Sequence, residues 1–231
     1  GYLAVLIIFV ETHFSVDILK SYIREGEHQQ QDFKFRVDDP KKIARTLAAF
    51  ANTDGGRLLV GVKDNGKVVG VFPEEEYHVI QGAAEMFCKP PVEITTEILQ
   101  DDHKLVLKVD TPPVKHKPVR AKDEHDRWKT YVRRDDHTLL ANKILVGVWK
   151  AQSKEIDLPQ RFDDDEMLIL NTIKEAGKIT LSKLYRRTKL RKSYIDKLLI
   201  LFIRWGIVQM DITHEGTHYL LSEKEIELSN D

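Results

Sequence analysis

The sequence predicts an α+β protein in two parts: a first part of mixed helices and strands, then helices followed by a β-hairpin. Short strand-like segments, several of them alternating between polar and apolar residues, predominate in the middle of the chain. Helical spacing of apolar residues predominates after residue 162, and a polar stretch with a proline separates the two patterns. We therefore expect a first domain over residues 1–150, a linker over 151–161 and a second domain over 162–231.

The composition is that of a globular protein from a reducing, cytoplasmic environment. Hydrophobic residues make up 42% and charged residues 32%, and the net charge of -1 means that any nucleic-acid site needs local segregation of charge. The single cysteine, Cys88, excludes a disulfide within one chain and is expected to be a buried small apolar side chain. The apolar run over residues 2–10 is shorter than the ~20 residues of a membrane helix. We expect no membrane contact and interpret the run as a buried strand or helix, or as an oligomer contact.

In the first part, a helix is expected over residues 15–24 and a half-exposed strand over 31–37, followed by a helix over 41–52 that Pro40 opens. Gly55 and Gly56 allow a sharp turn into a strand over 57–62. The Asp64-Asn65-Gly66 segment predicts a hairpin with a returning strand over 68–72. Further strands are expected over 92–99, 103–109 and 130–133, with a helix over 75–87.

In the second part, Asp163 and Glu166 form a capping-box pattern that opens a helix ending at Gly177. Further helices are expected over 181–188 and 192–205, and strands over 207–213 and 217–221. Three helices and a hairpin in about 60 residues resemble the winged helix-turn-helix family, and residues 188–198 (TKLRKSYIDKL) are similar to its turn and recognition helix.

The charge of this segment points to phosphates. Residues 178–204 contain nine Lys or Arg and one acid, Asp196. The expected nucleic-acid contacts are Lys183, Arg186, Arg187, Lys189, Arg191, Lys192, Tyr194 and Lys197. A solvated basic surface is the alternative. A hairpin tip of His214 and Glu215, without Lys or Arg, leaves open a winged helix that binds proteins.

A second resemblance covers most of residues 15–145. The pieces that carry it are Gly26-Glu27, Asp32-Phe33-Lys34, residues 48–56 (AAFANTDGG), residues 59–62 (LVGV), Asp64, Val69-Gly70, Tyr131-Val132-Arg133, Thr138 and Ala141. This pattern resembles the Schlafen AlbA-type domain, also described as a divergent AAA-type or DNA-binding domain. The resemblance implies a bacterial transcriptional regulator that often carries a C-terminal winged helix.

Some Schlafen relatives cleave RNA with three metal-binding acids. By motif position these acids fall on Glu27, Asp32 and Asp64, and they would hold Mg²⁺ or Mn²⁺ beside Lys34. Asp32 is shorter than the glutamate that the family commonly has before the Phe-Lys pair. The alternative interpretation is surface acids in a turn and at a strand end, and we favour it.

The glycine segment also admits an ATP-binding interpretation, but no Gly-Lys-Ser/Thr follows it, as a P-loop requires. A second basic cluster includes Lys115, Lys117 and Arg120, which could contact a nucleic-acid backbone. The leading hypothesis is a DNA-binding transcriptional regulator without catalysis or cofactor. A metal-dependent nuclease and a protein-interaction module are the alternatives, and RNA binding and a homodimer stay open.

Overall fold

The computed structural model describes residues 15–157 and 159–223, so the apolar run over residues 2–10 lies outside the described residues. The chain divides into two compact units, Gly1–Leu140 and Ala141–Asp231. The division falls before the boundary expected at residue 150, because Ile144 packs into the core of the second unit. No helix in the described ranges is long and apolar enough to cross a membrane.

The first unit is built around a four-stranded sheet with the strand order β1-β2-β5-β4. Its strands are β1 (Gln31–Lys34), β2 (Gly56–Val60), β4 (Thr95–Asp101) and β5 (Lys104–Thr111). β1 and β2 are parallel, with Asp32 opposite Leu58, whereas β2, β5 and β4 pair in antiparallel fashion.

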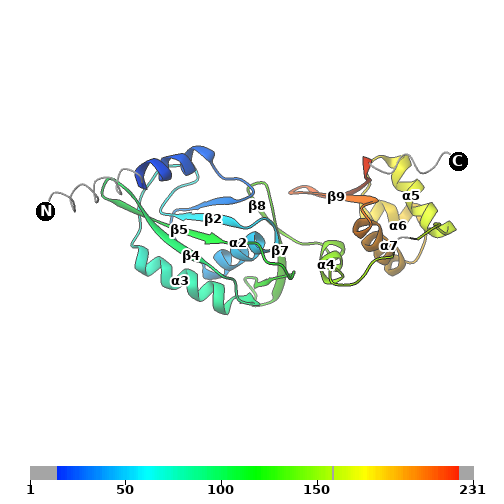
Figure 1. The fold of residues 1–231 in the computed structure, drawn as a ribbon, viewed down its shortest axis with the longest axis horizontal. Helices are drawn as coiled ribbons and strands as arrows, with labels where there is room; N and C mark the ends of the chain where they lie inside the picture. The colour runs from blue at the N-terminus through cyan, green and yellow to red at the C-terminus, as the bar shows by residue number, and fades with distance from the viewer. Residues whose placement is uncertain (1–14, 158, 224–231) are drawn as a thin grey trace. The chain divides into compact units, whose positions relative to one another are not determined.

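Helices cover both faces of this sheet (Figure 1). One face carries Phe33, Leu59 and Val106 and packs against Leu19 of the helix over residues 15–25. The other face packs against α2 (Pro40–Asn52) and α3 (Pro73–Met86). A sheet buried on both faces explains why Leu58, Leu59 and Val60 form a continuous apolar run.

A second sheet, in the order β3-β6-β7-β8, packs on the other side of α2. Its strands are β3 (Cys88–Lys89), β6 (Arg120–Lys122), β7 (Trp128–Arg134) and β8 (His137–Leu140). α2 starts where Asp39 accepts hydrogen bonds from the backbone N–H groups of Lys41 and Lys42, and Pro40 occupies its first turn. α2 therefore lies between two sheets, which explains why nine of its 13 residues are buried.

Most expected elements of the first unit are confirmed. α2, α3, β2 and β5 fall within a few residues of their predicted ranges, and Cys88 is buried. The returning strand over residues 68–72 is wrong, because beyond the turn only Val62 and Val68 form an isolated bridge. The strand expected over 31–37 is confirmed over Gln31–Lys34 only, and its half-exposed character is wrong, because Asp32 and Phe33 are both buried.

The second unit contains four helices and one hairpin among its described residues (Figure 1). They are α4 (Lys143–Lys150), α5 (Asp164–Ala176), α6 (Leu181–Thr188), α7 (Lys192–Arg204), β9 (Val208–Thr213) and β10 (Gly216–Leu221). The capping box of Asp163 and Glu166 opens α5, and Gly177 ends it with φ 66°, as predicted. Residue 158 and residues 224–231, which belong to the expected linker and second domain, lie outside the described residues.

The core of the second unit forms between α5, α6, α7 and the hairpin. Ile195, Leu199 and Phe202 bury the predicted face of α7, and Tyr219 of β10 closes the core from the hairpin. Ile179, which precedes α6, forms a bridge to Tyr219. The sequence patterns predicted no helix at α4. Its Gly147 lies so near Ile200 of α7 that an added Cβ would lie 2.3 Å from the Ile200 Cδ1 atom.

Candidate nucleic-acid interface

Seven of the eight predicted contact residues in the second unit are exposed cations. They lie on α6, on the turn that follows it and on the first half of α7: Lys183, Arg186, Arg187, Lys189, Arg191, Lys192 and Lys197. We refer to these seven residues as the basic surface. None of them forms an ion pair with an acidic side chain in the described ranges, whereas Lys143 and Lys178 of the same unit each do.

The local sequence explains why these side chains face outward. Thr180 caps α6 by accepting a hydrogen bond from the Lys183 backbone N–H, and the apolar Leu184 turns inward. Lys183, Arg186 and Arg187 have the i, i+3, i+4 spacing of one helix face, which differs from the side that buries Leu184 and Thr188.

The turn between α6 and α7 keeps the charge exposed on both helices. α6 ends at Thr188, and the C-cap residue Lys189 adopts the left-handed conformation with φ 58°. Arg191 takes the N-cap position of α7 without a side-chain cap, so the backbone N–H groups of the first turn of α7 have no side-chain acceptor from their own cap. Cations and helix N–H groups together favour an anion at this end of α7.

Tyr194, the eighth predicted residue, lies half-buried on the side of α7 that faces the start of α5. Burial, together with the carboxylates of Asp163, Asp165 and Glu166, raises the pKa of its phenol. A pocket of about 420 Å³ opens here between Asp165, Arg191 and Lys197. The basic surface is therefore bordered by acids on its α5 side.

Asp196, the one acid in residues 178–204, is neutralised within the unit. Its carboxylate pairs with Lys143 of α4 at 2.6 Å and accepts a hydrogen bond from the Tyr185 hydroxyl. The hydrogen bond to Asp196 raises the pKa of Lys143. The positive charge of the basic surface is therefore not reduced by a free carboxylate on α7, because Asp196 is already paired.

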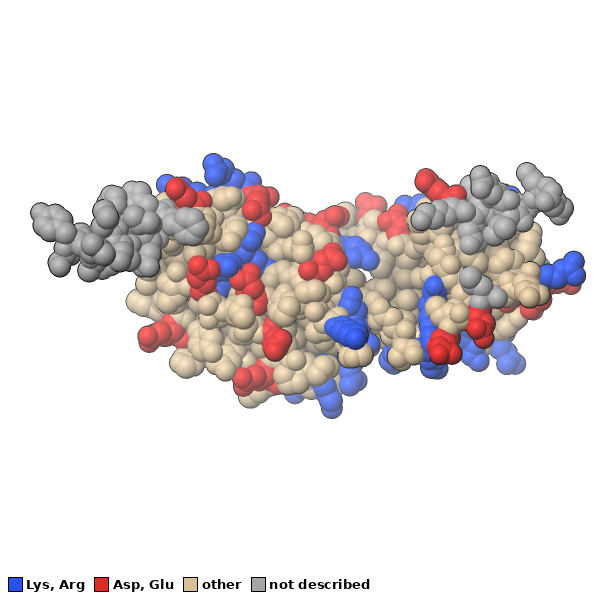
Figure 2. All heavy atoms as spheres, in the orientation of Figure 1, with Lys and Arg blue, Asp and Glu red and all other residues tan. Residues whose placement is uncertain are grey.

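The first and last cations of residues 178–204 form contacts within the protein. Lys178 pairs with Asp211 of β9, and Arg204 donates a hydrogen bond to the Lys154 carbonyl. At the hairpin tip His214 and Glu215 are exposed, as predicted. Figure 2 shows acidic and basic side chains interspersed over the face of the molecule in view.

The second predicted basic cluster lies in the first unit, at the entry to β6. Lys115 and Arg120 are exposed, whereas Lys117 is half-buried. Burial lowers the pKa of Lys117, and the nearby Arg134 acts in the same direction while Asp54 opposes it. The three side chains differ in exposure, and this cluster is less accessible than the basic surface.

The structure brings two of the three predicted metal-binding acids together and leaves the third apart. Glu27 Oε1 accepts a hydrogen bond from the Phe33 backbone N–H at 2.9 Å, which places Glu27 beside Asp32. Burial, and to a smaller extent Asp32, raises the pKa of Glu27. Asp64 is exposed in the turn after β2. Among the described residues no group of three His, Cys, Asp or Glu side chains could hold a metal ion.

Asp32 is bound by two cations. Lys34 Nζ lies 2.5 Å from its Oδ2 atom, and Arg133 of β7 donates to its Oδ1 atom at 3.2 Å. Lys34, which the alternative hypothesis assigned to a phosphate, is therefore occupied by this carboxylate. Both Asp32 and Arg133 are buried, at 4% and 1% exposure. Their ion pair links β1 of the first sheet to β7 of the second sheet.

Arg133 was not among the predicted site residues. Its guanidinium also donates to the backbone carbonyls of His28 and Gln31 and to the Thr138 hydroxyl. The sequence did offer one signal for Arg133, because it follows the apolar Tyr131 and Val132 within an expected strand. A charged side chain that is buried in a strand needs a partner of opposite charge in the core.

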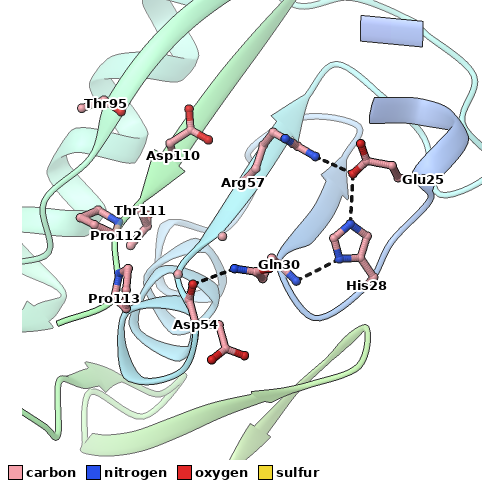
Figure 3. A pocket seen from close by; sticks show the side chains of 12 residues that line it. Glu25, His28, Gln30, Asp54, Arg57, Thr95, Asp110, Thr111, Pro112 and Pro113 are labelled. Atoms are coloured by element: carbon pink, nitrogen blue, oxygen red, sulfur yellow. Dashed lines mark hydrogen bonds and ion pairs between the residues drawn. The ribbon is translucent and has the colours of Figure 1, made fainter. Parts of the chain in front are cut away.

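The glycine segment lines a different pocket, of about 560 Å³, at the start of β2 (Figure 3). Figure 3 shows Glu25 between His28 and Arg57, at 3.3 and 2.8 Å, while the Gln30 side chain donates to the Asp54 carbonyl at 2.8 Å. Three carboxylates and one arginine line this pocket, which disfavours a polyphosphate.

The two glycines serve packing and the turn. Gly55 has φ +73°, and a Cβ on it would lie 2.7 Å from the Thr111 carbonyl oxygen. A Cβ on Gly56 would lie 2.4 Å from the Phe50 ring. The helix-to-strand turn expected at this position is confirmed, since α2 ends at Asn52 and β2 starts at Gly56.

Two solved structures are similar to parts of the chain. The DIP2311 protein from Corynebacterium diphtheriae matches with a TM-score of 0.41 and 16% identity, over 69% of this chain and 37% of that protein. The N-terminal domain of a RecG-related, ATP-dependent DNA helicase-type protein from Nitrosomonas europaea matches with a TM-score of 0.40 and 21% identity, over 64% of this chain and 97% of that domain. The chain thus spans well under two thirds of the Corynebacterium protein.

Comparison with curated protein sequences finds no match. The family model for the Schlafen AlbA_2 domain matches residues 27–142, which is half of the 231 residues and includes Asp32, the glycine segment and Arg133. The chain therefore belongs to the Schlafen AlbA_2 family.

Proposed function

We propose that the chain is a DNA-binding transcriptional regulator whose second unit is a winged helix-turn-helix. The observation that carries the proposal is the basic surface: seven exposed cations on two consecutive helices, without acidic partners in the described part of the chain. Unpaired cations at this density favour a polyanion, because each phosphate contact releases condensed counterions.

The order of the elements supports the winged-helix assignment. α5, α6 and α7 are followed by an antiparallel hairpin, and an isolated bridge joins Ile179, just before α6, to Tyr219 of that hairpin. In this arrangement α7 takes the place of the recognition helix, whose N-terminal residues meet base edges in the major groove. Arg191, Lys192 and Tyr194 lie in that part of α7.

Within this proposal, the first unit adds backbone contacts through Lys115, Lys117 and Arg120 and performs no catalysis. The engagement of Asp32 by Lys34 and Arg133 supports a role without catalysis, because a carboxylate that is already paired with two cations is a poor ligand for Mg²⁺ or Mn²⁺. RNA remains an alternative ligand of the basic surface, since phosphate contacts alone do not distinguish the two nucleic acids.

The test replaces Arg186, Arg187 and Lys192 together by Gln and measures binding to duplex DNA over a range of salt concentrations. If the three side chains bind phosphates, the slope of log K against log[salt] falls by ~0.9 for each phosphate that the variant no longer neutralises. The matched control replaces three exposed cations of the first unit, Lys20, Arg24 and Lys89, by Gln.

An unchanged slope in the first variant would remove the basic surface from the interface and favour a protein-interaction module. Equal reductions in both variants would show that net charge, rather than this surface, governs binding. Competition between duplex DNA and RNA of the same sequence decides which nucleic acid the surface prefers.

A further inference from the structure

The first unit contains a second pocket, of about 360 Å³, between β1, α2, β7 and β8. This volume lies within the ~300–1,000 Å³ that is usual for small-ligand sites. Asp32 and Lys34 reach it from β1, Lys42 and Arg45 from α2, and Arg133 from β7. All residues that line this pocket belong to the first unit, whereas the basic surface belongs to the second unit.

The residues that line this pocket carry an excess of positive charge. Lys34, Lys42, Arg45 and Arg133 stand against Asp32 and Asp136. Asp32 binds Lys34 and Arg133 together, so this group of three keeps one net positive charge. Arg45 forms ion pairs with two carboxylates outside the pocket, Glu124 at 2.8 Å and Asp39 at 3.8 Å, and both of these side chains are exposed. The residues that line the pocket thus carry two more positive than negative charges, which favours an anion as the ligand.

Arg133 is held in place before any ligand arrives. Its terminal nitrogens are fixed by Asp32, Thr138 and two backbone carbonyls, and the side chain is 1% exposed. Its Nε atom is nevertheless buried without a hydrogen-bond partner in the described structure. A buried donor of this kind is costly unless a water, an ion or a ligand satisfies it.

Lys42 complements this fixed arginine at the edge of the pocket. Its side chain is exposed and has no ion-pair partner among the residues that the structure describes, so it can move to a ligand. Tyr131 also lines the pocket, and burial raises the pKa of its phenol. The site thus combines one rigid guanidinium, a mobile ammonium and a hydroxyl group.

We propose that this pocket binds a terminal phosphate group, a phosphate monoester, either at the end of a nucleic-acid strand or on a mononucleotide. Four cations against two carboxylates among the lining residues match a dianion better than the single charge of a backbone diester. Guanidinium groups bind phosphate oxygens through charge-assisted hydrogen bonds, which are the strongest that a neutral-pH site offers. This inference concerns the first unit and goes beyond the proposed role of the basic surface.

The experiment compares binding of the full chain to single-stranded oligonucleotides of one sequence that carry a 5′ phosphate, a 3′ phosphate or no terminal phosphate. A parallel titration compares adenosine 5′-monophosphate with adenosine. We expect the terminal phosphate to increase affinity about tenfold, as one or two charge-assisted hydrogen bonds would. Lys42→Gln and Arg45→Gln should remove most of this difference, whereas the control Lys20→Gln should leave it unchanged.

The arms of the experiment identify the source of the phosphate. A preference for phosphorylated oligonucleotides that Lys42→Gln abolishes supports the pocket as a site for strand ends. A preference for the nucleotide over adenosine with no effect on oligonucleotides supports it as a mononucleotide site. Equal affinity with and without phosphate in both titrations would overturn the proposal, and so would a preference that survives both substitutions.

The outcome does not depend on the proposed function of the second unit. Binding through the basic surface contributes equally to oligonucleotides with and without a terminal phosphate. The Arg186, Arg187 and Lys192 variant should therefore weaken all oligonucleotides alike and preserve the difference between them.

Discussion

The Nζ atom of Lys143 lies 2.6 Å from the Oδ2 atom of Asp196, and this contact joins α4 to α7. It neutralises the one carboxylate in the basic segment over residues 178–204. The Tyr185 hydroxyl of α6 binds the other oxygen of the same carboxylate. α4 thus contributes to the electrostatics of the proposed interface, although the lysine comes from outside that segment.

Lys143→Gln should weaken DNA binding about two- to fivefold, because it leaves Asp196 as a free negative charge beside the basic surface. The effect should disappear in an Asp196→Asn background, where no carboxylate needs a partner. Fluorescence anisotropy of a labelled duplex measures both. Lys150→Gln, at the other end of α4, is the control. An equal reduction in the presence and absence of Asp196 would mean that Lys143 contacts DNA directly.

Arg133→Met should destabilise the first unit by about 3–5 kcal/mol, because it leaves Asp32 buried without its arginine. Lys34 still pairs with Asp32, so we expect the lower end of that range. Urea unfolding followed by circular dichroism gives the free energy of unfolding. Arg134→Met, at the neighbouring half-buried position, should cost about 1 kcal/mol or less. Similar destabilisation in the two variants would contradict the role given to the buried pair.

Gly56→Ala should destabilise the first unit by about 1–3 kcal/mol, since the added Cβ would lie 2.4 Å from the Phe50 ring. Gly82→Ala in α3 is the matched control, because its Cβ would meet only the flexible end of Met86 at 3.3 Å. Alanine in a helix is favoured over glycine, so the control should be neutral or stabilising. Thermal unfolding distinguishes the two. A neutral Gly56→Ala would show that the glycine is needed for something other than packing.

Trypsin should cut the native chain first after Lys154 or Arg161, because residues 152–157 and 161 are exposed and the segment lies outside the helices and strands. The cut falls inside the second unit, after α4, whose Ile144 packs into the core of that unit, so the two fragments should stay associated under native conditions. Mass spectrometry of a limited digest identifies the sites, and size-exclusion chromatography shows whether the fragments elute together. Earlier cleavage inside α2 or α7 would contradict the exposed segment as the preferred site.

The sequence by itself determined the features that depend on neighbouring residues. The cap at Asp163, the ends of α6 and the buried face of α7 follow from side chains within one or two turns of the helix. The local excess of positive charge over residues 178–204 and the burial of Cys88 were also predictable, because they depend on composition and residue type.

Tertiary structure alone decided the features that join distant residues. Asp32 and Arg133 are 101 positions apart in the sequence, and Lys143 and Asp196 are 53 positions apart. No local sequence pattern therefore predicts either ion pair. The same holds for Asp64, which the turn after β2 leaves exposed and apart from Glu27 and Asp32. Strand pairing and helix packing bring such partners together only when the whole unit folds, because the energy that places them comes from the shared core rather than from their own neighbours.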